Sequence, residues 1–247
     1  MRTTAFASRN TKEIVRDPLT ILFGLGFPLV LLVLLSAINA GMPKEANAPM
    51  FEIENLAPGI SVFGLSFLSL FSSMLIAKDR TSSFMLRLFT SPIRPSEFIL
   101  GYTIPMVPMA LAQSVICYAA AMFYGLEFSA DMILAIVVNL PVAIVFIALG
   151  LLFGSVLSEK AVGGVCGALL TNVSAWFSNI WFDTSMVGGW FETVSKILPF
   201  AHAVNAAKAA LAGNYGDIFP DLWWVIGYAV AILAAAVTVF SVTIKKN

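Results

Sequence analysis

The residues best suited to act on another molecule lie in the segment Lys78–Tyr102, KDRTSSFMLRLFTSPIRPSEFILGY, between two long apolar runs. Its helical part is amphipathic, and prolines at positions 92 and 95 end it. The apolar face carries Phe84, Met85, Leu88 and Phe89, and the basic face carries Arg80 and Arg87. A helix of this kind, held between two membrane spans, can bind a protein surface and be pushed by it. A solvated, positively charged connecting loop is the alternative interpretation.

Groups that could perform catalysis or bind a metal are few. The single histidine, His202, has no cluster of metal ligands near it in the sequence and no partner for a Ser/His/Asp arrangement. No glycine-rich loop ends in the Gly-Lys-Ser or Gly-Lys-Thr motif that holds nucleotide phosphates. We therefore expect no catalytic residue, metal or cofactor in this chain. His202 is expected to have a surface or interface role.

The elements that carry these residues are predicted to be membrane helices. Hydrophobic residues make up 59% of the 247 residues and charged residues only 11%, well below the fraction in a soluble domain. The sequence predicts a single all-α integral membrane domain, 1–247, because six uncharged stretches are each long enough to cross the hydrocarbon core. These stretches cover about 19–38, 57–77, 98–124, 132–157, 161–181 and 222–244.

The absence of charge within these stretches restricts the kind of transport. Carriers driven by protons or ions usually keep ionisable residues inside the membrane, and these six stretches contain none. If the chain moves a solute uphill, the energy must come from another subunit. The net charge of zero gives no reason to expect nucleic acid as a partner.

The distribution of Lys and Arg predicts the orientation. With the N-terminus inside, eleven cations lie in cytoplasmic segments and three in outer segments, which indicates that both termini are cytoplasmic. The inner cations are Arg2, Arg9, Lys12, Arg16, Lys78, Arg80, Arg87, Arg94, Lys160, Lys245 and Lys246, and the outer ones are Lys44, Lys196 and Lys208.

Several shorter features complete the prediction. Residues 1–17 are basic and weakly amphipathic, typical of a helix lying on the inner membrane surface, and Asp17-Pro18 is an N-cap that opens the first span. Residues 182–221 predict an external hairpin of two short helices, with Trp190 and Phe191 on an apolar face of the first helix and Pro199 between the two. The pairs Gly150/Gly154 and Gly163/Gly167 favour close helix approach, with chance as the alternative, and Cys117 and Cys166 are too far apart in depth to bridge.

The chain resembles the membrane subunit of type-2 ATP-binding-cassette (ABC) exporters along essentially its whole length. The motifs that carry the resemblance are Arg16-Asp17-Pro18, Leu56-Ala57-Pro58-Gly59-Ile60, Ile76-Ala77-Lys78-Asp79-Arg80, Leu86-Arg87-Leu88, Ser91-Pro92-Ile93, Pro95–Tyr102 and Leu198-Pro199-Phe200. Lys208 stands where arginine is commoner in that family.

The resemblance implies a set of partners and roles. Loop 78–97 would be a coupling helix docked on an ABC ATPase, using Asp79, Arg80, Phe84, Arg87, Leu88, Arg94 and Glu97. Two ATPase subunits, which bind the ATP and magnesium, would join two permeases, identical or homologous, in a bacterial or archaeal plasma membrane. The hairpin 182–213, with Trp190, Phe191 and Pro199, would be the external gate, and spans two and five would line the path.

The residues of those two spans support a path of mixed character. Span two places aromatic side chains on one stripe and span five places amides and an indole on one face; core packing or lipid contact is the alternative. The candidate path residues are Phe63, Phe67, Phe71, Asn172, Trp176 and Asn179. They favour an exporter of apolar or amphipathic cargo (drug-like, lipid or peptide). A lipid-linked glycan or polysaccharide exporter, and a passive channel or scaffold subunit, are the alternatives.

Overall fold

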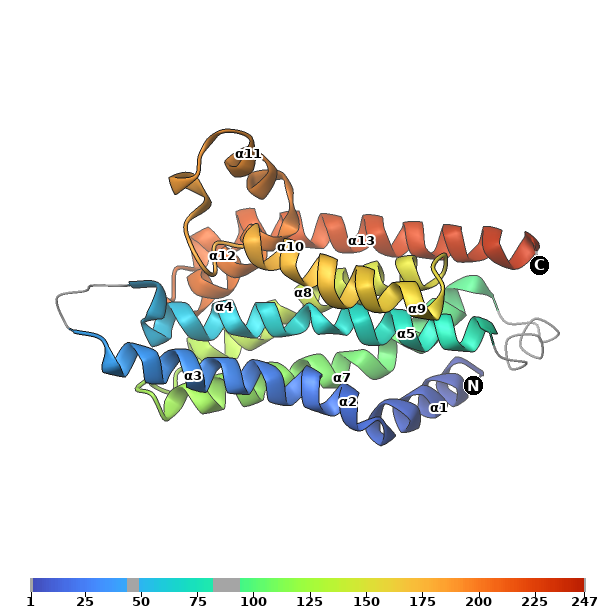
Figure 1. The fold of residues 1–247 in the computed structure, drawn as a ribbon, viewed down its shortest axis with the longest axis horizontal. Helices are drawn as coiled ribbons and strands as arrows, with labels where there is room; N and C mark the ends of the chain where they lie inside the picture. The colour runs from blue at the N-terminus through green and yellow to red at the C-terminus, as the bar shows by residue number, and fades with distance from the viewer. Residues whose placement is uncertain (1, 44–48, 82–93, 247) are drawn as a thin grey trace.

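The computed structural model describes residues 2–43, 49–81 and 94–246, and this part of the chain is helical with short connections (Figure 1). The all-α expectation is confirmed for it. The elements are α1 (Arg2–Arg16), α2 (Pro18–Ile21), η1 (Leu22–Gly26), α3 (Phe27–Gly41), η3 (Pro49–Phe51), α4 (Ile53–Leu65), α5 (Phe67–Thr81), α7 (Pro95–Met122), α8 (Ala130–Gly154), α9 (Glu159–Val162), η4 (Gly163–Leu170), α10 (Thr171–Trp176), η5 (Thr184–Met186), α11 (Gly189–Ile197), α12 (Pro199–Leu211) and α13 (Tyr215–Lys246).

Five helices in the described residues are long and apolar enough to cross a membrane: Pro18–Gly41, Ile53–Thr81, Pro95–Met122, Ala130–Gly154 and Tyr215–Thr243. They confirm a multi-pass membrane protein. The predicted stretch 161–181 is helical only as far as Trp176 and is not among the five. It begins after two charged residues and contains several polar ones, so its hydropathy is lower, and the count of six spans stays a prediction.

The first span begins as its sequence predicts. Asp17 is the N-cap of α2, and its carboxylate accepts hydrogen bonds from the Leu19 amide at 3.1 Å and the Thr20 hydroxyl at 2.5 Å. Pro18 occupies the first helical turn, where its missing N–H has no cost. The chain turns at this cap, so that α1 lies at an angle to the span that follows (Figure 1).

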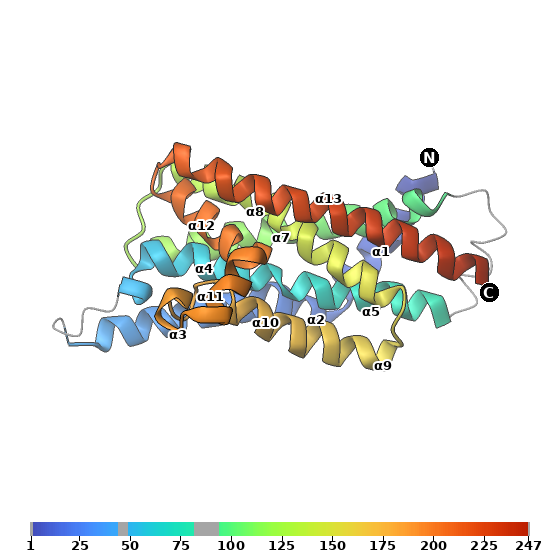
Figure 2. The ribbon, with the colours of Figure 1, turned by 90° about the horizontal axis from the view of Figure 1, so that it is seen from above.

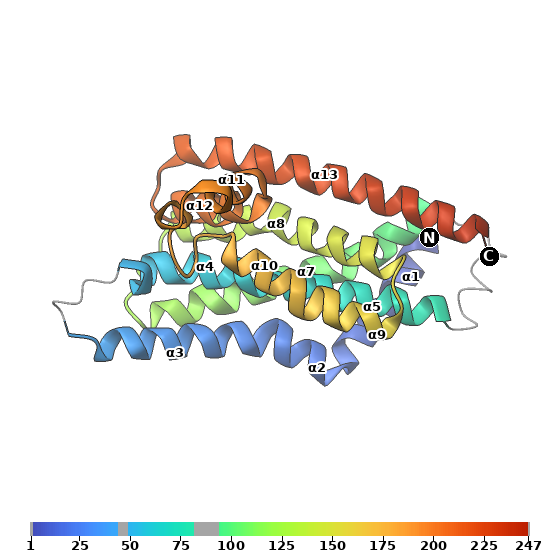
Figure 3. The ribbon, with the colours of Figure 1, turned by 45° about the horizontal axis from the view of Figure 1, so that its top comes forward.

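The helix formed by α4 and α5 is at the centre of the bundle. In its most apolar stretch of 18 residues, 83% of the residues are buried. The span that contains α3 and the span α13 lie on opposite sides of it (Figures 2 and 3). In the most apolar 18-residue stretch of each, only 22% of the residues are buried. Both chain ends, the end of α5 and the start of α9 lie at one end of the bundle. The short helices α11 and α12 lie toward the other end (Figure 1).

Two glycines bring α8 into direct contact with the central helix. A Cβ atom at Gly150 would lie 2.1 Å from the Ser72 hydroxyl and 2.2 Å from the Ser69 carbonyl oxygen, and one at Gly154 would lie 2.6 Å from the Ser73 carbonyl oxygen. The first small-residue pair therefore does what the sequence predicts. In the second pair the prediction is wrong only for Gly163, where a Cβ atom would meet nothing within 4 Å, whereas one at Gly167 would lie 3.2 Å from the Leu70 side chain of α5.

Buried polar side chains join the central helix to its neighbours. The Asn139 amide of α8 donates to the hydroxyls of Ser61 (2.8 Å) and Ser114 (3.1 Å), from α4 and α7. The Ser72 hydroxyl of α5 lies 3.2 Å from the Ile147 carbonyl oxygen of α8. All four side chains that hydrogen-bond here are at most 2% exposed. They bond to protein groups because no water reaches them in the bundle interior.

The predicted external hairpin differs from the structure in two respects. The final span α13 begins at Tyr215, seven residues before the predicted start at 222. The second short helix, α12, ends near Leu211 as predicted, but it is packed inside the bundle against α4, α8 and α13. Its small side chains explain this burial, since four alanines allow close approach: Ala203, Ala206, Ala207 and Ala210 are at most 1% exposed.

Candidate functional site

A buried carboxylate at the end of α5 joins three helices. Asp79 is 2% exposed and accepts two hydrogen bonds from the Arg9 guanidinium of α1, at 2.5 and 2.8 Å. The Tyr102 hydroxyl of α7 donates to the same carboxylate at 2.9 Å. A bidentate guanidinium–carboxylate contact fixes both the distance and the relative orientation of the two side chains. Helix α1 is therefore attached to the C-terminal end of α5. We call Arg9, Asp79 and Tyr102 the Asp79 cluster.

Further contacts extend this attachment along α1. Glu13 forms ion pairs with Arg9 at 2.9 Å and with Lys78 at 2.8 Å. The Asn10 amide is fully buried and donates to the Gly101 carbonyl at 3.0 Å. Aromatic contacts on the apolar side, where Phe6 meets Phe98 and Tyr102 with ring centroids 5.4 and 4.9 Å apart, complete the attachment. The expectation of a lipid-facing amphipathic helix is therefore incomplete, because much of α1 binds the bundle.

Arg80 attaches the end of α5 to a different neighbour. Its guanidinium donates to the carbonyl oxygens of Gly154 (2.9 Å) and Leu157 (3.1 Å), at the C-terminal end of α8. The last carbonyls of a helix lack partners within the helix and carry partial negative charge, so a cation is well placed there. Adjacent residues of α5 thus bind α1 and α7 through Asp79 and α8 through Arg80.

The start of α7 is fixed by its own cap. Arg94 is the N-cap residue, and its backbone N–H donates to the Glu97 carboxylate at 2.8 Å in a capping box. Four of the predicted coupling residues therefore flank the segment 82–93. Asp79 and Arg80 fix the end of α5 before it, and Arg94 and Glu97 fix the start of α7 after it. Phe84, Arg87 and Leu88 lie outside the described residues.

The predicted path residues fall into two groups. Phe63, Phe67 and Phe71 are buried, and Phe67 packs edge-on against Phe27 with ring centroids 5.4 Å apart. Phe63 packs in the same way against Trp181, at 5.9 Å. In the single chain Phe67 and Phe71 therefore contact the first span, whereas Phe63 contacts the segment that follows α10.

The span-five residues differ from one another. Trp176 is 50% exposed, and Asn172 is exposed with its amide bonded to the Ala168 carbonyl at 2.8 Å. Asn179 has a left-handed backbone, with φ of 59°, and its side-chain oxygen accepts hydrogen bonds from the amide and hydroxyl of Thr184. Asn179 therefore shapes the turn that leads to the hairpin of α11 and α12, and the side chains of Asn172 and Trp176 are exposed on the surface of the single chain.

The comparison with known families fits this arrangement. The family model described as ABC-2 type transporter matches residues 1–212 of the chain, which include the Asp79 cluster and both ends of the segment 82–93. The chain belongs to the ABC-2 type transporter family. It is a permease subunit of an ABC transporter, and its family generally works with an ABC ATPase. No individual curated protein matches the chain.

In this ABC-2 permease the predicted gate residues lie in and between α11 and α12. Trp190 is 72% exposed on α11, and Phe191 stacks on Phe177 with ring centroids 4.4 Å apart. Pro199 is buried at the first position of α12. Gly188 is the N-cap of α11 and Gly189 its first residue, with φ of 67° and 59°, a conformation that favours glycine, so the sharp entry into the hairpin depends on them.

A cavity of about 860 Å³ lies between α1 and the central helix of the permease. Its apolar side is formed by Phe71, Met74, Leu75 and Met106. Its polar side is formed by α1 and the start of the first span, with the charged residues Arg9, Lys12, Glu13, Arg16 and Asp17, together with Lys78 and Glu159. The sequence analysis missed this cavity, because it forms only when the chain turns at Asp17-Pro18.

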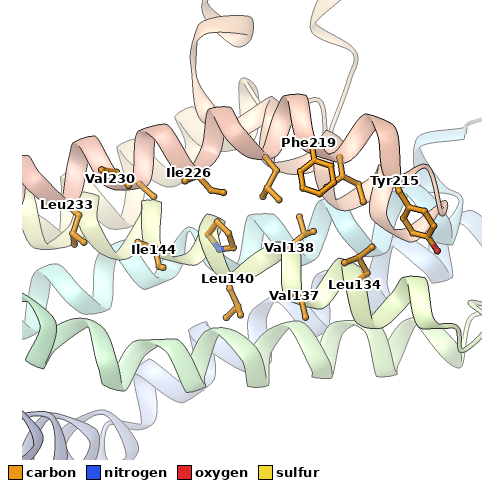
Figure 4. A pocket seen from close by; sticks show the side chains of 14 residues that line it. Leu134, Val137, Val138, Leu140, Ile144, Tyr215, Phe219, Ile226, Val230 and Leu233 are labelled. Carbon is orange, nitrogen blue, oxygen red and sulfur yellow. The ribbon is translucent and has the colours of Figure 1, made fainter.

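A second hollow of about 810 Å³ lies between α8 and α13 and is almost wholly apolar. Side chains such as Leu134 and Ile144 from α8 and Phe219 and Val230 from α13 border it (Figure 4). Both helices are candidate membrane spans. Hydrocarbon therefore suits this hollow, and it contains no polar group arranged for specific binding.

Replacing Arg9 by Ala is expected to destabilise the permease by about 3 kcal/mol, since a carboxylate 2% exposed loses its two guanidinium hydrogen bonds. We expect a lower melting temperature and faster amide hydrogen exchange in α1. The matched control is Lys12→Ala, an exposed cation on the same helix without an ion pair in the described residues, which should change stability by less than about 0.5 kcal/mol. Equal losses in the two variants would contradict the role of the Asp79 cluster.

Proposed function

We propose that this permease is the membrane-spanning half of an ATP-driven exporter, energised through the segment 78–97 by a separate ATPase. The observation that carries the proposal is the attachment of this segment at both ends. Asp79 and Arg80 bind α1, α7 and α8 on one side, and Arg94 and Glu97 form the α7 cap on the other. A displacement of the segment by an ATPase would therefore move four helices together.

The orientation that this function needs is supported by charge and by position. The two chain ends and the ends of α5 and α8 lie at the same end of the bundle (Figure 1), and ten of the twelve Lys and Arg residues that the structure describes are in the segments at that end. The positive-inside rule makes this end cytoplasmic. We accordingly propose six crossings, with Glu159–Trp176 as the fifth, in a bacterial or archaeal inner membrane.

The complex is proposed to contain two permeases and two ATPase subunits. Support comes from the surface of the fifth segment, where Asn172 and Trp176 are exposed one helical turn apart in the single chain. Exposed polar and aromatic groups together at membrane depth are better suited to another protein surface or a wet path than to lipid tails.

The cargo is proposed to be apolar or amphipathic. The cavity beneath α1 combines an apolar side with charged groups, and at the proposed inner surface it is open to a molecule that has both characters. Lys12 and Arg16 form no ion pair in the described residues, which favours an anionic head group. A lipid-linked glycan with a phosphate group fits the same chemistry and is the second candidate. A small, multiply charged solute would lose its hydration among uncharged spans.

The test is ATPase stimulation in a reconstituted complex of permease and ATPase. Anionic amphiphiles are expected to stimulate hydrolysis, and Met74→Asp, which puts a charge on the apolar side of the cavity, should raise their half-saturating concentration about tenfold. The control Met186→Asp alters an exposed methionine of the outer hairpin and should leave that concentration unchanged. Stimulation by hydrophilic, multiply charged solutes alone would contradict the cargo class. Equal stimulation in the Met74 variant would contradict the cavity.

A further inference from the structure

The only histidine of the chain lies where α11, α12 and α13 meet. His202 is on the first turns of α12, and its Nδ1 atom is hydrogen-bonded to the Asp221 carboxylate of α13. Its Nε2 atom lies 2.8 Å from the Lys196 carbonyl oxygen, near the end of α11. Both ring nitrogens therefore face hydrogen-bond acceptors on other helices.

This geometry determines which form of the imidazole fits. A neutral histidine has one N–H, so it can donate to Asp221 or to Lys196 but not to both. Neither a carbonyl oxygen nor an ionised carboxylate can donate in return. The doubly protonated ring is the only form that satisfies both contacts.

The same junction caps the end of α11 with other donors. The Trp224 indole N–H and the Tyr228 hydroxyl of α13 donate to the Ile197 carbonyl oxygen, at 2.8 and 3.0 Å. The last carbonyls of α11 thus receive hydrogen bonds from α12 and α13, and a cation at a helix C-terminus is favourable. When His202 loses a proton, one connection of this cap is lost and the positive charge disappears.

The charged groups around His202 leave Asp221 as its electrostatic partner. On α11, Lys196 pairs with Glu192 through its ammonium group, and on α8, Asp131 accepts from the Tyr215 hydroxyl. The acidic and basic residues on the elements packed against α12 are Asp217, Asp221, Lys245 and Lys246 of α13, Glu192 and Lys196 of α11, Asp131 of α8 and Glu54 of α4, with Lys208 on α12 itself. Of these residues, Asp221 through its carboxylate and Lys196 through its backbone carbonyl are hydrogen-bonded to the His202 ring.

We propose that protonated His202 is a latch that holds α11 against α12 and α13, and that a rise in external pH releases it. The latch is intrinsic to the permease, and only its exposure to the outside rests on the proposed function. The motion it controls is that of the hairpin tip, where Trp190 is exposed and Gly188 and Gly189 form the entry.

The direction of the pH dependence follows from the contacts. The hydrogen bond with Asp221 raises the pKa of His202 above its ordinary value of 6.5, against the opposing effect of burial. A group whose pKa is higher in the latched state favours that state fully below its ordinary pKa, and the preference is lost as pH rises through the raised value. Each unit of increase corresponds to a tenfold change in the latch equilibrium.

A single histidine makes the experiment direct. Permease labelled with ¹⁵N-histidine in nanodiscs should give one pair of ring signals, with both nitrogens protonated at pH 6.5 and a midpoint above that value. Asp221→Asn should lower the midpoint, whereas Asp217→Asn, an exposed carboxylate one turn away without a bond to His202, should not. A wild-type midpoint at or below 6.5, or one that Asp221→Asn leaves unchanged, would overturn the latch.

Hairpin motion provides the second readout. Spin labels at Thr193 of α11 and at Phe123, which is 90% exposed, should show a narrow distance distribution below pH 6.5 that broadens at higher pH. Asp221→Asn should give the broad distribution at lower pH than wild type, and a distribution independent of pH would overturn the proposal. In vesicles with a different pH on each side, a response to internal pH alone would contradict the proposed orientation while leaving the latch intact.

Discussion

Replacement of Arg87 by Glu is expected to abolish transport while the permease still inserts and folds. The sequence places Arg87 on the basic face of the amphipathic segment that we propose docks on the ATPase. Charge reversal at a hydrogen-bonded interface contact costs about 2–5 kcal/mol, enough to reduce binding by more than tenfold. The flanking residues Asp79, Arg80 and Glu97 would keep their contacts, so the bundle itself should be unaffected.

The measurement is transport, together with ATPase co-purification, for protein in proteoliposomes. Lys160→Glu is the matched control, because it reverses an exposed cation at the same end of the bundle but outside the segment. That control should retain assembly and transport, since an exposed ion pair contributes only about 0–1 kcal/mol. Wild-type transport by the Arg87 variant would show that the segment merely connects two spans.

Gly150→Ala is expected to prevent normal packing of α8 on the central helix. The added methyl group would lie 2.2 Å from a backbone oxygen, that of Ser69, which cannot rotate away as a side chain can. The two helices would have to separate, and the Ser72 to Ile147 hydrogen bond at 3.2 Å would lengthen with them. We expect a loss of about 3 kcal/mol or more, at the upper end of the range for overpacked cores.

Gly227→Ala distinguishes this steric effect from a general effect of removing glycine. Gly227 lies within α13, and a Cβ atom there would meet nothing within 4 Å. The control should be neutral or slightly stabilising, because alanine has the higher helix propensity. Melting temperature and the yield of monodisperse protein in detergent measure both effects. Wild-type stability in both variants would contradict the close contact between Gly150 and the Ser69 carbonyl oxygen.

Local sequence signals predicted the local parts of this structure. Asp17-Pro18 specified a cap because its hydrogen bonds reach only two and three residues along the chain. The apolar face of α11 and the end of α12 near Leu211 likewise followed from helical spacing and from Gly213-Asn214. Gly150 and Gly154 suggested close packing without showing which helix they contact.

Contacts between distant residues could not be predicted in this way. Arg9 and Asp79 are 70 positions apart, and a cation near the N-terminus is equally consistent with binding anionic lipid. The location of α12 could not be predicted either, since an amphipathic helix too short to span can lie on a membrane or pack inside a helix bundle. Its alanines determine the outcome only because α4 and α8 leave a space of that width. The role of Phe63 and Phe67 was likewise not predictable, because aromatic residues at this helical spacing can either pack within one chain or line a transport path.

The polar contacts of the central helix also affect how the protein is made. Ser61 and Ser72 find their partners in α8, at positions 78 and 75 residues later in the chain. At a synthesis rate of about 5–20 residues per second, the ribosome needs about 4–15 s to produce them. During that interval the Ser72 hydroxyl can bond to the Leu68 carbonyl oxygen of its own helix, at 2.7 Å, whereas Ser61 lacks its α8 partner Asn139. We expect nascent chains that stop before Ala130 to leave Ser61 without this partner and to be recognised more readily by membrane quality control.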